Sequence, residues 1–142
     1  GCEFAQRSEW THEGQLDWGA LASPLHAGMQ RWVADLNALL RAERALHDVD
    51  FDAAGFEWID GGDADRSVVT FLRRSPRGRP VLVACNFDSN AQSMRLGELG
   101  NRGLFSQVQL QDLHSGESPL MDGEDLVIPG FRFYWLSDRR SH

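Results

Sequence analysis

The chain has 142 residues, of which 42% are hydrophobic and 25% charged, which is the composition of an ordinary globular protein. Its formal net charge of -7 argues against a nucleic-acid partner, because a phosphate-binding surface needs a basic stripe, whereas a neutral sugar is not penalised. No apolar run approaches the roughly 20 residues that cross a bilayer, so we expect no membrane partner. Two distant cysteines, Cys2 and Cys85, predict a reduced, cytoplasmic protein.

The first 46 residues are predicted to form a loop and then one helix. Ser23 and Pro24 are typical of a helix start, since the fixed φ of proline suits the first turn. Apolar residues then recur at spacings of three and four as far as about Arg44, and they predict one apolar face: Leu25, Met29, Trp32, Val33, Leu36, Leu39 and Leu40. Because this short piece has nothing of its own to cover that face, we expect the face to pack on other protein.

After residue 47 the apolar period shifts towards two, which predicts β-strands. The strongest are 67–74 and 80–87, and the turn at 76–79 predicts a hairpin. The further candidate strands are 56–59, 93–96, 104–111, 125–128 and 131–136. Short strands divided by Gly, Asn and Asp indicate an antiparallel sandwich, and strand parity predicts that Trp135 faces its core. We therefore predict two domains, 1–46 and 47–142.

Catalytic chemistry was sought first among the ionisable residues. Two carboxylates are what glycoside chemistry requires, and four acids crowd the N-terminal loop: Glu3, Glu9, Glu13 and Asp17. An acid-rich loop is more often solvated or helix-capping, so this pattern alone assigns no catalytic residue. The five histidines show no HxxxH or HExxH spacing, which predicts no metal site, and no motif indicates a cofactor.

The tryptophans offer candidate binding residues. Five Trp in this chain is a rich content, and their large faces stack on sugar rings but serve protein cores equally well. Trp32 lies on the apolar helical face and is predicted to pack. Trp58 precedes an acidic turn where the sandwich begins, and it is our first candidate for an exposed sugar platform. For Trp10, in the acid-rich loop, packing and substrate contact both remain open.

Several motifs, in the same order along the chain, carry a resemblance to a known family. They begin at residues 1–6, 9–10 and 16–18, continue through 24–32, 35–37, 45–47, 50–51 and 55–60, and end with 67–68, 71–74 and 86–87. Over these first 87 residues the chain resembles the glycogen branching enzymes of the α-amylase superfamily. Because it starts at Gly1 without an initiator Met, we expect it to be a C-terminal fragment of such an enzyme.

The resemblance implies an α+β fold: the last strand, loop and helix of a (β/α)8 barrel, followed by an antiparallel β-sandwich that packs on that barrel. It implies a 1,4-α-glucan branching activity in which a glucan is held on an Asp nucleophile and passed to a 6-hydroxyl. The family's catalytic acids lie upstream of Gly1, so no residue here is assigned as catalytic. Glu3 and Gln6 fall at the end of the last barrel strand, where they either contact substrate or brace the following loop.

The resemblance weakens after Asn86 and Phe87, where the chain lacks the long loop usual in branching enzymes. Residues 111–117 instead look like a segment common in other enzymes of the superfamily. Two alternatives therefore stay open. One is another α-glucan-active enzyme of the superfamily. The other is a non-catalytic glucan-binding module.

Overall fold

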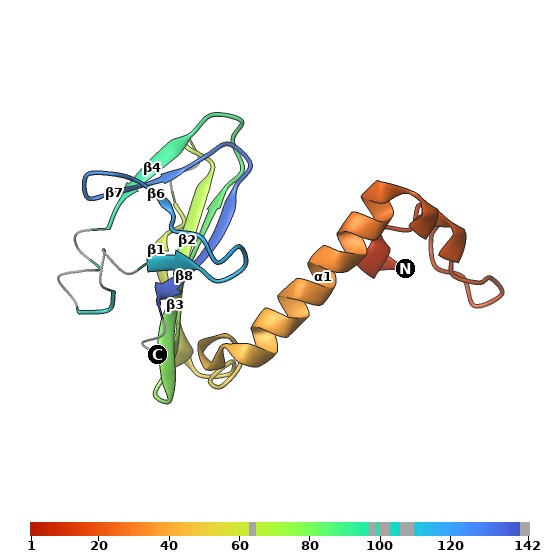
Figure 1. Ribbon diagram of the computed structural model, residues 1–142. Coiled ribbons are helices and arrows are strands. Elements are labelled where there is room, and N and C mark those ends of the chain that lie inside the picture. Colours follow the sequence, from red (N-terminus) through yellow and green to blue (C-terminus); the bar gives the residue numbers. More distant parts are fainter. Residues whose placement is uncertain (63–64, 97–98, 100–102, 106–109, 140–142) are drawn as a thin grey trace. The chain divides into compact units, whose positions relative to one another are not determined.

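The computed structural model describes residues 1–62, 65–96, 99, 103–105 and 110–139 (Figure 1). The chain divides into two compact units, Gly1–Leu40 and Arg41–His142. Each unit is described below by itself. The domain boundary expected after residue 46 stays a prediction.

The first unit is built from short helical turns and most of one long helix. The 3-10 helices η1, Cys2–Phe4, and η2, Trp18–Ala22, precede the helix α1, Pro24–Ala42. The helix predicted from the spacing of apolar residues is confirmed, and it ends two residues earlier than expected. Phe4 is buried, with its ring 5.5 Å from that of Trp18. No residue of α1 is buried, so the apolar face of the helix lies largely open.

The second unit, Arg41–His142, is called the β-unit below. It begins with η3, Arg44–Leu46, and η4, Ala53–Gly55, and continues as an all-antiparallel β-structure. Its strands are β1 Phe56–Asp60, β2 Val68–Ser75, β3 Gly78–Asn86, β4 Gln92–Arg95, β5 Leu110–Asp112, β6 Leu120–Asp122, β7 Asp125–Ile128 and β8 Phe133–Asp138. One sheet has the order β1-β2-β3-β8-β5 and the other β4-β7-β6. The predicted hairpin is confirmed as β2–β3, closed by the pairing of Ser75 with Gly78.

The two sheets enclose one apolar core. Its fully buried members come from both sheets, among them Leu72, Leu82 and Leu136 from the larger and Leu126 and Ile128 from the smaller. Strand parity explains the selection, because alternate residues of each strand point to the same face. The antiparallel two-sheet structure predicted from the sequence is therefore confirmed.

Three sequence-based details differ from the structure. Trp135 does not face the core between the sheets, because Tyr134 and Leu136 occupy the inward positions of β8 and Trp135 points to the other face. Strand β6 was missed, because three residues are too few for a period to show. The strand expected at 104–111 is seen only from Leu110, and residues 106–109 lie outside the described residues.

The outer face of the larger sheet carries a second apolar cluster. Buried Ala45, Val81 and Val83 form its centre, and five partly buried side chains surround them: Leu46, Phe71, Cys85, Leu113 and Trp135. This cluster explains why β3 is buried at nearly every position from Val81 to Asn86 instead of at alternate ones. A strand with apolar residues on both faces is typical of a sheet that is covered on both sides.

Candidate functional site

Gln6 has a bracing role in the N-terminal unit. Its side-chain oxygen accepts a hydrogen bond from the backbone N–H of Asp17 at 2.9 Å, and its side-chain nitrogen donates to the carbonyl of Ser8 at 3.1 Å. These bonds tie together two loop segments eleven residues apart. Glu3 is exposed, and a backbone hydrogen bond to its carboxylate holds the pKa of Glu3 below its usual value.

Trp10 extends from the loop between η1 and η2. Its side chain is 82% exposed, and its ring contact is with His12, at a centroid distance of 6.4 Å. So exposed an indole contributes little to the core of this unit.

Trp58 lies at the centre of an aromatic cluster on the edge strand β1. Its ring meets those of Phe56 and Phe71 edge-on, at 5.0 and 5.8 Å, while the two phenylalanine rings stack at 5.3 Å. Even so, 61% of Trp58 is exposed. Gly61 lies against the six-membered ring, because a Cβ built there would stand 3.1 Å from Cε3 of Trp58. The indole is therefore held in one orientation with most of its surface open to solvent.

One ion pair lies on the face of the sheet that carries this cluster, and another lies on the opposite face. Arg66 donates to the Asp60 carboxylate at 2.8 Å and to the carbonyl of Ser93 in β4, because a bulge after Trp58 pairs Asp60 with the inward-facing Thr70. Arg73, which is paired in register with Phe56, bonds the carboxylate of Asp50. Aromatic faces beside a few fixed polar groups are typical of small-molecule sites.

Sequence analysis singled out Trp58 but missed Phe56 and Phe71. The alternation of Phe56 and Trp58 in one strand was a usable signal, because residues two apart share a face. The contribution of Phe71 depends on the register that pairs it with Trp58, which the sequence does not reveal.

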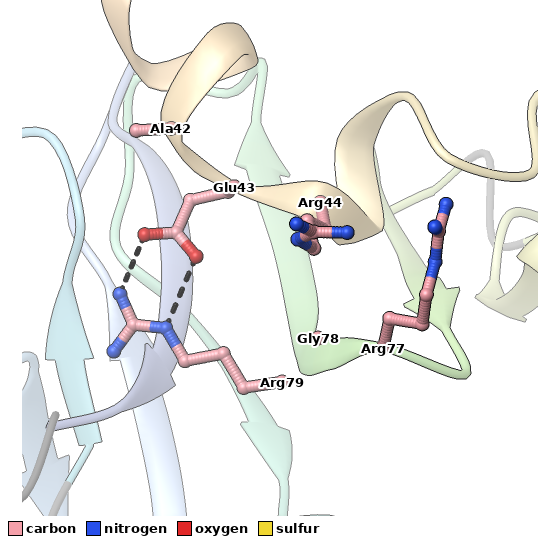
Figure 2. A pocket seen from close by; sticks show the side chains of 6 residues that line it. All are labelled: Ala42, Glu43, Arg44, Arg77, Gly78 and Arg79. Atoms are coloured by element: carbon pink, nitrogen blue, oxygen red, sulfur yellow. Dashed lines mark hydrogen bonds and ion pairs between the residues drawn. The ribbon is translucent and has the colours of Figure 1, made fainter.

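A hollow of about 430 Å³ lies where the start of the β-unit meets the β2–β3 hairpin (Figure 2). Its lining is mostly charged: Ala42, Glu43, Arg44, Arg77, Gly78 and Arg79. Arg79 donates to both carboxylate oxygens of Glu43, at 3.1 and 2.7 Å, and also bonds the carbonyl of Asp138. The only carboxylate lining this hollow is thus held in a two-pronged ion pair, so the hollow offers no pair of carboxylates for glycoside chemistry.

Asp48 makes further bonds between the start of the β-unit and the β2–β3 hairpin. It accepts hydrogen bonds from the Ser75 hydroxyl at 2.8 Å and from Nε of Arg77 at 3.2 Å, and Arg44 lies 3.9 Å away. The Ser75 hydrogen bond, assisted by the arginines, holds the pKa of Asp48 below its usual value. Together with Glu43–Arg79, these bonds attach the segment Glu43–Asp50 to the hairpin.

A second hollow, of about 490 Å³, belongs to the N-terminal unit. It is lined by Arg7, Asp17, Gly19, Ala20, Ala22, Ser23 and His26, and the ring of His26 is fixed by a 2.8 Å hydrogen bond to the carbonyl of Phe4. Glu3, Gln6 and Trp10 are not among its lining residues. The structure therefore does not gather the three N-terminal candidates around one cavity, and Trp58 belongs to the other unit. Their roles in substrate binding stay predictions.

In the described part of the chain, no group of three or more His, Cys, Asp or Glu side chains is arranged to hold a metal ion. No helix among the described residues is long and apolar enough to cross a membrane. Neither Cys2 nor Cys85 forms a disulfide, and burial raises the pKa of the Cys85 thiol to about 11.

With the fold and these side chains in place, the class of the β-unit follows from comparison with known families. Residues 58–112, from Trp58 to Asp112, match the family model of the alpha amylase C-terminal all-beta domain. This match spans β1 to β5 and so covers most of the larger sheet.

The particular relatives are 1,4-alpha-glucan branching enzymes named GlgB. The chain is 59% identical to the enzyme of Aromatoleum aromaticum over 61% of the present chain. It is 56% identical to the enzyme of Cereibacter sphaeroides over 92% of the present chain, and 52% identical to the enzyme of Burkholderia vietnamiensis over 100% of it. It spans 14%, 17% and 18% of these relatives. The predicted resemblance to a C-terminal segment of a glycogen branching enzyme is confirmed.

Solved structures support the fold alone. A crystal structure of AmyP in complex with maltose superposes with a TM-score of 0.63 at 13% identity, covering 91% of this chain and 25% of that one. The α-glucosyl transfer enzyme XgtA gives a TM-score of 0.51 at 18% identity, covering 78% and 18%.

Proposed function

We propose that this chain is the C-terminal part of a 1,4-α-glucan branching enzyme, which cleaves α-1,4 bonds and transfers the glucan to a 6-hydroxyl. The observation that carries the proposal is the 52% identity with a GlgB enzyme over the whole chain. Within that enzyme the β-unit supports the catalytic domain, and residues 1–46, in which the structure shows 3-10 turns and α1 but not the expected strand, supply the closing loop and helix of its barrel. The bond-breaking residues lie outside this chain, so the chain alone is inactive. Its setting is cytoplasmic, in keeping with two unpaired cysteines.

One apolar surface supports a scaffold role. It is the open face of α1, where Leu25 is 83% exposed. Contiguous exposed apolar surfaces of this kind mark places where other protein packs. The partner we propose for this face is the rest of the parent enzyme, its barrel in particular.

The decisive experiment is a chimera. The matching segment of the Burkholderia vietnamiensis enzyme is replaced by this chain, and the product is assayed on amylose for loss of iodine colour, new α-1,6 links and reducing sugar. We expect branching with little reducing sugar, and none from the chain alone. A folded chimera that forms no new branches would mean that this chain does not serve as the C-terminal part of a branching enzyme.

A second candidate function is glucan binding by the β-unit, and Trp58 favours it. A flat, exposed indole of fixed orientation suits the apolar face of a glucose ring, and the Arg73–Asp50 ion pair lies on the same face of the sheet. We propose further substrate contacts at Trp10, Gln6 and Glu3, for which exposure of Trp10 and Glu3 is the support. The proposed substrate is glycogen or amylose, with no cofactor or metal.

Glucan binding is tested by electrophoresis of the chain through gels that contain glycogen. Trp58→Ala removes the indole, and the expected loss of about 1 kcal/mol lowers retention about fivefold. Phe51→Ala is the matched control, because Phe51 is fully exposed and is not among the rings of the aromatic cluster. Equal retention of both variants and the parent chain would remove Trp58 from the site.

A further inference from the structure

The loop that joins β7 to β8 holds a bulky residue in an unusual backbone conformation. Phe131 has φ +53°, in the left-handed region that L-residues rarely adopt, and its side chain is 66% exposed. A buried ring could justify strained backbone by its packing, but a mostly exposed ring cannot. Backbone strain of this kind gathers at ligand-binding positions, where the surrounding structure enforces it.

Asn86, at the end of β3, provides that enforcement. Its buried side-chain nitrogen donates to the carbonyls of Asn90, Ile128 and Pro129 at 2.8, 2.9 and 3.1 Å. One amide group therefore links the β3–β4 loop to the β7–β8 loop. The geometry of Phe131 is set by this scaffold and does not depend on the ring itself.

Two backbone contacts complete the link. The N–H of Phe131 donates to the carbonyl of Asp88 at 2.9 Å. Gly130 lies so close to the neighbouring loop that a Cβ built on it would stand 2.0 Å from the carbonyl oxygen of Ser89. The two loops thus form a rigid pair from which Phe131 projects, and Phe87, at the start of the other loop, is also exposed.

Polar groups of both signs stand on the same loops. Asp88 accepts hydrogen bonds at Oδ1 from the backbone N–H and the side-chain nitrogen of Asn90, at 2.7 and 2.9 Å, which leaves Oδ2 with lone pairs for an outside donor. The Asn90 backbone bond lowers the pKa of Asp88, so this carboxylate stays ionised at mildly acidic pH. Arg132 is exposed beside Phe131, with its guanidinium carbon 5.3 Å from the centre of the Tyr134 ring.

We propose that these two loops form a second α-glucan-binding surface, in which Phe131 stacks on a glucose ring and Asp88 accepts a sugar hydroxyl. A pair of loops that carries one carboxylate and one guanidinium has no net charge to attract an ion, and its acceptors and donors suit a neutral ligand that both donates and accepts hydrogen bonds. The proposal rests on the proposed function for its choice of polysaccharide. It shares no residue with the Trp58 cluster.

The test exploits the strain. Phe131→Gly removes the ring and also suits φ +53°, so the variant keeps or raises the melting temperature by a few degrees while binding is weakened. A merely structural role for Phe131 predicts the opposite, a lower melting temperature with binding unchanged. Binding is measured on the whole 142-residue chain by titration with maltoheptaose and by retention in amylose gels.

We expect Phe131→Gly and Phe131→Ala each to weaken maltoheptaose binding about fivefold, and Asp88→Asn to weaken it less. Phe51→Ala is the matched control and binds as the parent chain does. The loss on Phe131→Gly is measured again in a Trp58→Ala background, where it persists if the two surfaces are separate. Undiminished binding by the Phe131 variants overturns the proposal, and so does a parent chain that binds no α-glucan.

Failure here is distinguishable from failure of the proposed function. If the chimeric enzyme branches amylose but Phe131→Gly binds normally, only the second surface is wrong. If the chimera does not branch while Phe131-dependent binding of maltoheptaose is observed, the branching activity is wrong and the surface stands.

Discussion

The helix α1 and the strands of the β-unit are both strongly patterned, yet they bury very different amounts of their apolar surface. No residue of α1 is buried, whereas Leu72, Leu82 and Leu136 are completely so. The difference lies in the second layer. The β-unit supplies two sheets that face each other, while the helix has no matching layer within its own unit. An apolar period therefore predicts the element, and burial depends on what the chain brings against it.

The sharpest way to break this comparison is to truncate one leucine from each region. Leu72→Ala removes a fully buried side chain from the core of the sandwich, and we expect it to lower the free energy of unfolding by about 2–5 kcal/mol. Leu25→Ala removes the same atoms from an open helical face, and we expect it to change the free energy of unfolding by less than about 0.5 kcal/mol. Urea unfolding followed by the fluorescence of the β-unit's tryptophans measures both. Similar losses in the two variants would mean that α1 is covered in solution.

An ion pair holds the segment where α1 ends and the strands of the β-unit begin. Glu43 is buried and paired with Arg79 through two hydrogen bonds. Arg79→Ala removes the two hydrogen bonds to that carboxylate and the bond to the carbonyl of Asp138, and we expect a loss of about 2 kcal/mol in the free energy of unfolding. Arg79→Lys keeps the positive charge but cannot make the two-pronged ion pair. We therefore expect its free energy of unfolding to lie between those of the parent chain and the alanine variant. An unchanged urea midpoint for Arg79→Ala would show that this ion pair does not hold the segment.

A smaller, pH-dependent effect is expected from Asp48. Its pKa is lower in the folded chain than in the unfolded one, chiefly because the Ser75 hydroxyl bonds the carboxylate. The unfolded chain therefore takes up this proton first as the pH falls. The resulting stabilisation is complete from about pH 5 upwards and is lost as the pH falls through the folded-state pKa. Asp48→Asn is expected to lower the urea midpoint at pH 7 and to flatten its decline between pH 5 and pH 2, and a parallel decline in both proteins would refute the assignment.

The sequence predicted most of the elements, because helix and strand periods are local properties. It predicted α1 and the β2–β3 hairpin, and it also predicted strand β7. For β7 the predicted and observed bounds are the same. It misplaced Trp135, because parity tells which residues share a face but not which face is inside, and β8 has apolar residues on both. Trp58 was identified from its type and position, whereas its neighbour Phe71 and the scaffold beneath Phe131 depend on register and on hydrogen bonds between distant loops.

The smallest effect on stability, and the most direct test of the comparison, is expected on the open face of α1. Leu25→Glu with Trp32→Glu places two charges on that face, and we expect the free energy of unfolding of the β-unit to change by less than about 0.5 kcal/mol. Sedimentation velocity should show that the parent chain self-associates through this surface and that the double variant does so less, because a charge brought into an apolar contact loses its water. Ala34→Glu with Ala38→Glu adds the same charge to the opposite side of the helix and should leave self-association unchanged. A parent chain that sediments as a monomer at high concentration would mean that the open face of α1 drives no association by itself.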